Sequence, residues 1–238
     1  MILNSILATA ARFDGLLKEG STESEAAVYH SRALAMIISA LDRPARTYNS
    51  ALLTAVVVAR LYEELDPNSD KQCCHLLGTS QILEHLTTLG KIADNGLAEA
   101  TCWLHLRQAI TYSITHGSPL NANLSCLKSL TTIGRKGDTA HGNHIMYLFA
   151  EVLQQYFPSS DAELHSACDK EISKDPDDEQ TWKRIADDID HWFQTKPSSF
   201  TPLHYQAQDV TKGMPFPKLW MTSATQGKSP STSFTWEY

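Results

Sequence analysis

The residues best placed to do chemistry are the carboxylates of the string LYEELD, which follows an apolar run at residues 52–59. Glu63, Glu64 and Asp66 could act as general acids or bases if burial or a like charge raised their pKa toward neutrality. They precede a proline turn, however, and a helix end of this kind usually meets water. We therefore predict a solvated helix end, on which Arg60 and Glu64 pair at the surface with i,i+4 spacing.

A second candidate is the string ADDIDHWF at residues 186–193, in which Asp187, Asp188 and His191 fall within about one helical turn. An Asp-rich helix in an all-α fold is similar to the magnesium-diphosphate sites of terpene synthases. Such a site requires a carboxylate in place of His191, a second metal-binding segment and basic residues that bind the diphosphate. We find none of these in the sequence. We interpret the string as the solvated face of an amphipathic helix and predict no metal ligand.

The remaining histidines and cysteines are scattered. His141 and His144 are spaced i,i+3 without a third zinc ligand beside them, and the CCH string at 73–75 points three ways around a helix. Five cysteines without a CxxC pair favour free buried thiols in a reducing compartment. The chain has no GxSxG, P-loop or GxGxxG string. We predict no catalytic residue, no cofactor and no enzymatic activity.

Arg107 lies in the middle of an otherwise apolar segment. An isolated buried charge is very costly, so a buried Arg107 must pair with a carboxylate, for which Glu99 and Glu151 are the candidates. We predict a structural buried pair in preference to a ligand site. The alternative, an enzyme on a helical scaffold, would line its site with Tyr62, Trp103, His105, Arg107 or the face of Asp187–His191.

Composition narrows the function classes. The chain has 238 residues, 42% of them apolar, which is enough for a sizeable core. Its formal charge of −7 opposes binding to the phosphate backbone of nucleic acids, so no direct nucleic-acid binding is expected. No apolar run is long enough to cross a bilayer, and the N-terminus lacks the basic region of a signal peptide. We expect a soluble intracellular protein.

Apolar periodicity predicts helices, and the punctuation by Gly, Pro and Asn separates them. One stripe on each of the first two helices is predicted to face the core: Leu3, Ile6/Leu7, Ala10, Phe13 and Leu16/Leu17, then Val28, Ala35, Ile38 and Leu41. Residues 118–139 are predicted as a loop. The predicted helices cover about 2–18, 23–41, 48–65, 70–89, 97–116, 142–157 and 179–194, the last with Trp182, Ile185, Ile189 and Trp192/Phe193 on its apolar face.

The valines at 56–58 would suit a strand, but no second period-2 segment lies near enough to pair with them. We therefore predict that 52–59 is the buried half of a central helix, apolar on all sides. The fold class is all-α, an antiparallel helical bundle or an irregular helix-hairpin stack. Residues 1–196 are predicted as the helical domain and 197–238 as an irregular tail, extended or disordered.

The order of the helical segments resembles the regulatory domain of fungal zinc binuclear cluster transcription factors. The resemblance covers most of the chain. The strings RLYEELD and GLAEATCWLHLRQ carry it best. The matching pieces are MILNSILATAARF at 1–13, YHSRALAMIISAL at 29–41, LLTAVVVARLYEELD at 52–66, HLLGTSQIL at 75–83, GLAEATCWLHLRQAITYSI at 96–114, NHIMYLFAEVLQQYF at 143–157, WKRIADDIDHWFQTKPSSFTPLHY at 182–205 and FPKLW at 216–220.

The resemblance implies a nuclear regulator of transcription, with nutrient use or secondary metabolism as possible targets. Its helical domain would receive a small-molecule signal and restrain activation. The sequence begins inside that domain, so the family's zinc cluster and its DNA reading are not carried over. The sequence also departs from the family pattern after residue 220. A natural short relative and a truncated gene model would both show such a departure. Partners would be related transcription factors or other proteins, in the nucleus or otherwise in the cytoplasm.

Overall fold

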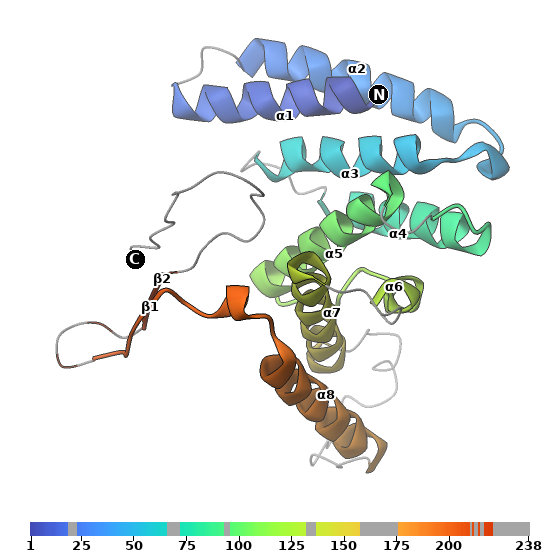
Figure 1. Cartoon of the computed structure of the whole chain (residues 1–238). Helices are drawn as coiled ribbons and strands as arrows, with labels where there is room; N and C mark the ends of the chain where they lie inside the picture. The colour runs from blue at the N-terminus through green and yellow to red at the C-terminus, as the bar shows by residue number, and fades with distance from the viewer. Residues whose placement is uncertain are drawn as a thin grey trace, which may run out of the picture. The chain divides into compact units, whose positions relative to one another are not determined.

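The computed structural model describes residues 1–18, 23–65, 72–92, 96–131, 137–157, 176–209, 211, 214 and 217–220. This part of the chain is almost entirely helical, which confirms the predicted all-α fold class (Figure 1). The helices are α1 (Ile2–Leu17), α2 (Glu23–Leu41), α3 (Ser50–Glu64), α4 (Gln72–Thr88), α5 (Leu97–His116), α6 (Leu124–Thr131), α7 (Asp138–Tyr156) and α8 (Pro176–Thr195).

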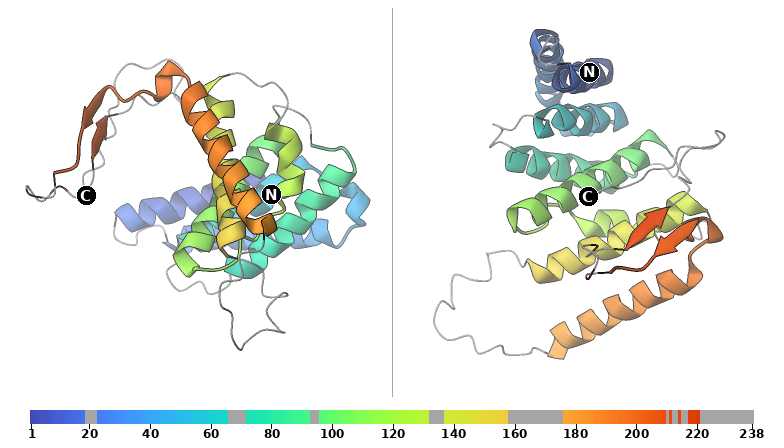
Figure 2. Two further views of the ribbon diagram at one scale, coloured as in Figure 1. Left: turned by 90° about the horizontal axis from the view of Figure 1, so that it is seen from below. Right: turned by 90° about the vertical axis from the view of Figure 1, so that its left-hand side faces the viewer.

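The valine-rich segment is helical and central, as predicted. Asn49 caps the start of α3, because its side chain accepts a hydrogen bond of 3.0 Å from the backbone N–H of Leu52. Leu53 and Val57 on this helix are fully buried. α3 contacts α1, α2, α4 and α5, and Figure 2 shows it between the layer of α1 and α2 and the layer of α4 and α5. A helix enclosed in this way can be apolar all round.

The prediction that the apolar stripes of α1 and α2 are buried in the core is wrong, because most of these side chains are exposed, although Ile38 and Leu41 line a cavity between α2, α3 and α4. Phe13 is 55% exposed and Ile38 is 57% exposed, and Leu3, Leu16, Leu17, Val28 and Leu41 are exposed with them. The buried residues of the two helices are small, namely Ser5, Ala8, Ala26 and Ala33, with Ile37.

Small side chains occupy the packed face of α1 and α2 because they let the helix backbones approach closely. The Ser5 hydroxyl donates to the carbonyl of Ala55, 3.1 Å away on α3, and Thr9 donates to the carbonyl of Val58 at 3.4 Å. Such bonds between a side chain and the backbone of another helix need a short interhelical distance. A leucine at Ala8, which is fully buried, would force the helices apart.

Contacts divide the chain into two units, Met1–Leu130 with Ala150–Asp169 and Thr131–Phe149 with Lys170–Tyr238. The predicted domain boundary at residue 196 stays a prediction. In the first unit, helix α6 lies inside the segment predicted as a loop. Its eight residues are too short for the periodicity argument, which needs a longer window.

In the second unit, Ile185 of α8 is buried and the indole of Trp192 donates to the carbonyl of His141 at 2.9 Å. Trp192 also packs edge-on against Phe200, with ring centroids 5.9 Å apart. Trp182 and Phe193 are exposed, so only part of the predicted apolar face of α8 is covered.

The described residues after 196 are largely irregular, as predicted, but include three short elements. A 3-10 turn covers Ser198–Phe200, and strands β1 (His204–Gln206) and β2 (Lys218–Trp220) pair antiparallel, with Tyr205 opposite Leu219. Strands of three residues are too short to show a period-2 pattern, so this strand pair could not be predicted from periodicity.

Candidate functional site

A cavity of about 670 Å³ lies between α2, α3 and α4, all within the first unit. Its floor is the core formed where α2 meets α3, around Ile37 and Ala59. Ile38 and Leu41 line it while remaining exposed, so they form an apolar rim. The lining residues are Leu34, Ile37, Ile38, Leu41, Ala45, Tyr48, Val56, Ala59, Gly78, Thr79, Gln81, Ile82 and His85.

The wall formed by the 3-10 turn Ala45–Thr47 and Tyr48 is held in place by polar contacts. The Tyr48 hydroxyl donates to the carbonyl of Leu41 at 2.9 Å. The ammonium of Lys91 donates to the carbonyls of Arg46 at 2.6 Å and of Tyr48 at 2.9 Å. These contacts fix the segment between α2 and α3, so the cavity is largely pre-formed in the way ligand pockets usually are.

Few polar groups in the cavity are available to a ligand. The Tyr48 hydroxyl is already bonded, Thr79 already has a partner, and Gln81 is exposed. The imidazole of His85 meets the Tyr48 ring edge-on, with centroids 6.0 Å apart. Its Nε2 is shielded from solvent and has no hydrogen-bond partner among the described residues. A polar atom in that state is costly unless something completes its hydrogen bond.

A small-molecule pocket between helices was expected, but the sequence did not predict which residues would line it. The lining depends on how α2, α3 and α4 pack, which helical periodicity alone does not fix. One signal was present: Gly78 stands inside α4, and a glycine in a helix interior is unfavourable by about 1 kcal/mol relative to alanine.

Beside the cavity, α3 carries a buried arginine. Arg60 is 1% exposed; it lies 3.0 Å from the Glu64 carboxylate and donates to the side-chain oxygen of Gln108 at 3.2 Å. The predicted pairing of Arg60 with Glu64 is therefore confirmed. The predicted surface placement is wrong for Arg60, which is buried, and right for Glu64, which is exposed. Gln108 in turn donates to the carbonyl of Val57 at 3.2 Å, which ties α5 to α3.

Burial acts on both partners of this pair. It lowers the pKa of Arg60, against the opposing charges of Glu64 and Glu63. Burial likewise raises the pKa of Glu64, against the attraction of Arg60. Arg60 thus holds its charge in a poorly solvated place, against a carboxylate that still reaches water.

The carboxylate end of α3 is less solvated than predicted. Glu63 approaches the imidazole of His30 on α2 to 3.6 Å, and only 12% of its side chain is exposed. His30 also stacks on Tyr62, with ring centroids 4.1 Å apart. The prediction of a solvated end is wrong for Glu63 because α2 covers that face of α3. Asp66 lies outside the described residues.

His105 of α5 is a buried histidine that the sequence did not single out as structural. It is fully buried, and its Nε2 lies 3.1 Å from the hydroxyl of Ser80 on α4. That hydroxyl also donates to the carbonyl of Asn121 at 3.1 Å, which assigns the proton of the histidine to Nε2. Burial, helped by the charge of Arg60, lowers the pKa of His105 to about 4. The residue is therefore neutral near pH 7.

The residues predicted to form a structural buried pair lie on α5 and α7. Arg107 is partly buried, burial lowers its pKa, and its guanidinium donates to the carbonyl of Trp103 at 3.0 Å. Glu99 is buried and accepts a hydrogen bond of 3.3 Å from the Trp103 indole. Glu151 on α7 is partly buried. The pairing of Arg107 with Glu99 or Glu151 stays a prediction.

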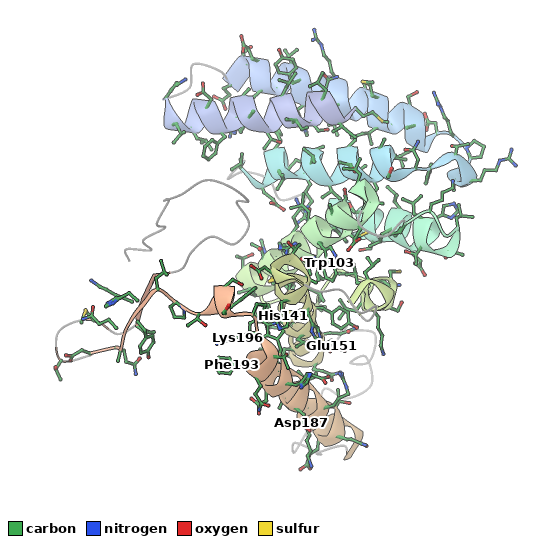
Figure 3. The ribbon with its side chains drawn as sticks, in the orientation of Figure 1. Trp103, His141, Glu151, Asp187, Phe193 and Lys196 are labelled. Carbon is green, nitrogen blue, oxygen red and sulfur yellow. The ribbon has the colours of Figure 1, made fainter. Side chains whose placement is uncertain are left out.

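The Asp-rich face of α8 is open to water. Asp187 and His191 are exposed, and Asp188 pairs with Arg184 at 3.0 Å. Figure 3 shows Asp187 and Phe193 along α8, with Lys196 just beyond its end, where its ammonium lies over the Phe193 ring. Within the described ranges, no group of three His, Cys, Asp or Glu side chains is placed to hold a metal ion.

Two cysteine thiols are buried and free, as predicted. They are Cys102 and Cys126, and burial, with a contribution from Cys126, raises the pKa of Cys102 to about 12. Such a thiol is not a nucleophile near neutral pH. The side chains of the CCH string at 73–75 and of Cys168 lie outside the described residues. None of the described helices is long and apolar enough to cross a membrane.

Comparison with protein families, with curated proteins and with solved structures finds no match to this chain.

Proposed function

We propose that this chain is an effector-sensing helical domain in transcription regulation, related to the regulatory domains of fungal zinc binuclear cluster factors. It works in the nucleus. In this proposal the domain receives a small-molecule signal and restrains activation by a partner that reads DNA. The ordered resemblance of its segments to that family motivates the proposal.

The observation that carries the proposal is the cavity between α2, α3 and α4. Its lining comes mainly from three of the segments that carry the resemblance, namely 29–41, 52–66 and 75–83. A pre-formed apolar cavity with few polar groups is typical of a small-molecule site. The same helices therefore supply the family pattern and a place for an effector.

Action through a partner is supported by surface chemistry. α1 and α2 expose large apolar side chains, among them Leu3, Phe13 and Ile38, and exposed apolar clusters commonly mark protein contacts. The net charge of −7 opposes binding to phosphate backbones. The exposed Asp187 and the ion-paired Asp188 give no support to the metal-dependent enzyme considered as the alternative.

A binding assay tests whether the chain reads DNA by itself. Purified full-length chain is expected to show no sequence-dependent binding to a pool of duplex DNA at physiological salt, because it lacks a basic groove-reading element. Fluorescence anisotropy with labelled duplexes measures this. Sequence-dependent affinity that weakens steeply as salt rises would contradict the proposal.

A further inference from the structure

We propose that the cavity between α2, α3 and α4 binds an uncharged, mainly apolar small molecule that carries one hydroxyl or carbonyl oxygen. This inference rests on the proposed effector-sensing function and names the ligand class. The cavity, at about 670 Å³, lies within the range of about 300 to 1,000 Å³ in which drug-sized molecules are bound. The exposed rim residues Ile38 and Leu41 give it an apolar entrance.

The described lining offers no counter-charge to a charged ligand. No Asp, Glu, Lys or Arg is among the residues that line the cavity in the described part of the chain. Two neighbouring basic groups are already engaged: the ammonium of Lys91 is bonded to the carbonyls of Arg46 and Tyr48, and Arg60 is paired with Glu64. A carboxylate, phosphate or amine would therefore lose its hydration without gaining a counter-charge.

Among the described lining residues, His85 supplies the polar contact. The Tyr48 hydroxyl and Thr79 are already bonded and Gln81 is exposed, whereas the Nε2 of His85 is buried without a partner. Because that nitrogen is shielded from solvent, a ligand oxygen reaches it when the ring turns about its Cβ–Cγ bond. A ligand hydroxyl can accept from a protonated ring nitrogen or donate to an unprotonated one, and a carbonyl can accept, so a single oxygen is sufficient.

Gly78 keeps the cavity open and provides the means to close it. A Cβ built on Gly78 meets no described atom within 4 Å. Larger side chains there can therefore extend into the cavity without displacing the backbone. Gly78→Ala and Gly78→Leu form a matched pair, because both remove the glycine from α4 but only leucine fills much of the space.

The experiment uses two fluorescent probes that differ by one charge. Phenylnaphthylamine is uncharged and apolar, and anilinonaphthalene sulfonate has the same rings with an added sulfonate. The full chain is expected to bind phenylnaphthylamine saturably and the sulfonate at least about tenfold more weakly, because the sulfonate meets no cation in the cavity. Equal affinity for the two probes would overturn the exclusion of charge.

The variants locate the site. Gly78→Leu is expected to bind phenylnaphthylamine at least about tenfold more weakly than Gly78→Ala, which removes the same helix glycine but fills less of the space, while both variants retain their helical circular dichroism. A folded Gly78→Leu protein that binds as well as the parent would overturn the proposal, because the probe would then lie elsewhere, for example on the exposed faces of α1 and α2.

Competition by naphthol and naphthalene tests the oxygen contact. Naphthol is expected to displace the probe from the parent with an affinity about tenfold above that of naphthalene, and His85→Leu is expected to remove the difference. A preference for naphthol that survives in His85→Leu would contradict the role of His85. Failure of these tests would remove the effector site but not the proposed restraint of activation, because that part of the proposed function is measured by reporter output and DNA binding.

Discussion

Replacement of Arg60 with alanine is expected to lower the free energy of unfolding by about 3 kcal/mol. The guanidinium is 1% exposed, and its removal leaves the oxygen of Gln108 and the carboxylate of Glu64 without their cation. It also leaves a void in the contact between α3 and α5. The loss comes mainly from this void and from the Gln108 oxygen, which stays buried without its donor, because the Glu64 carboxylate, with 30% of its side chain exposed, can turn to water.

Urea unfolding followed by circular dichroism measures this loss. Lys18→Ala is the control in the same unit, since Lys18 pairs with Asp14 at i,i+4 spacing but both side chains are exposed, and it should cost less than about 0.5 kcal/mol. The double variant Arg60→Met, Glu64→Leu replaces both partners by apolar groups and should recover most of the loss. If Arg60→Ala were as stable as Lys18→Ala, the buried pair described here would be wrong.

Acidification from pH 7 to pH 4 is expected to remove about 3 kcal/mol of stability through His105 alone. The pKa of this residue falls from an ordinary 6.5 to about 4 in the folded chain, through burial first and the charge of Arg60 second. Because the folded-state pKa is depressed, the unfolded chain takes up the proton first. The stabilisation is complete above about pH 6.5 and is lost as pH falls toward about 4.

His105→Gln isolates this contribution, because glutamine can donate to the Ser80 hydroxyl but does not titrate. Stability curves from urea unfolding at several pH values should be flatter for this variant than for the parent. The raised pKa of Glu64 acts in the opposite direction, stabilising the fold at low pH, and is common to both proteins. His116→Gln, at the exposed end of the same helix, should keep the parental slope. Identical slopes for His105→Gln and the parent would contradict the buried neutral histidine.

Much of the fold could be predicted from the sequence. Apolar periodicity, capping residues and helix-breaking residues predict the ends of α3 and α5 to within a residue or two of their observed bounds. These signals act over only a few helical turns, so the sequence alone is enough to read them. The orientation of α1 and α2 could not be predicted in this way. Periodicity identifies an apolar stripe but does not say whether a neighbour covers it, and here the small residues such as Ser5 and Ala8 form the packed face.

The candidate site was harder to predict than the fold. Arg60 looks like a surface residue in sequence because it opens a charged string, and only the approach of α5 through Gln108 buries it. His85 and Gly78 belong to no recognisable sequence motif. They line a cavity only because α2 and α3 pack opposite α4. Properties that arise from contacts between remote segments leave little trace in a single sequence.

A reporter experiment tests the central claim most directly. The full chain is fused between a heterologous DNA-binding domain and a strong activation domain, and a fusion with an unrelated helical protein of similar length serves as the control. If this chain is a regulatory domain that restrains activation, reporter output should fall severalfold below the control at equal protein abundance. Output equal to the control at matched abundance would contradict the proposed function.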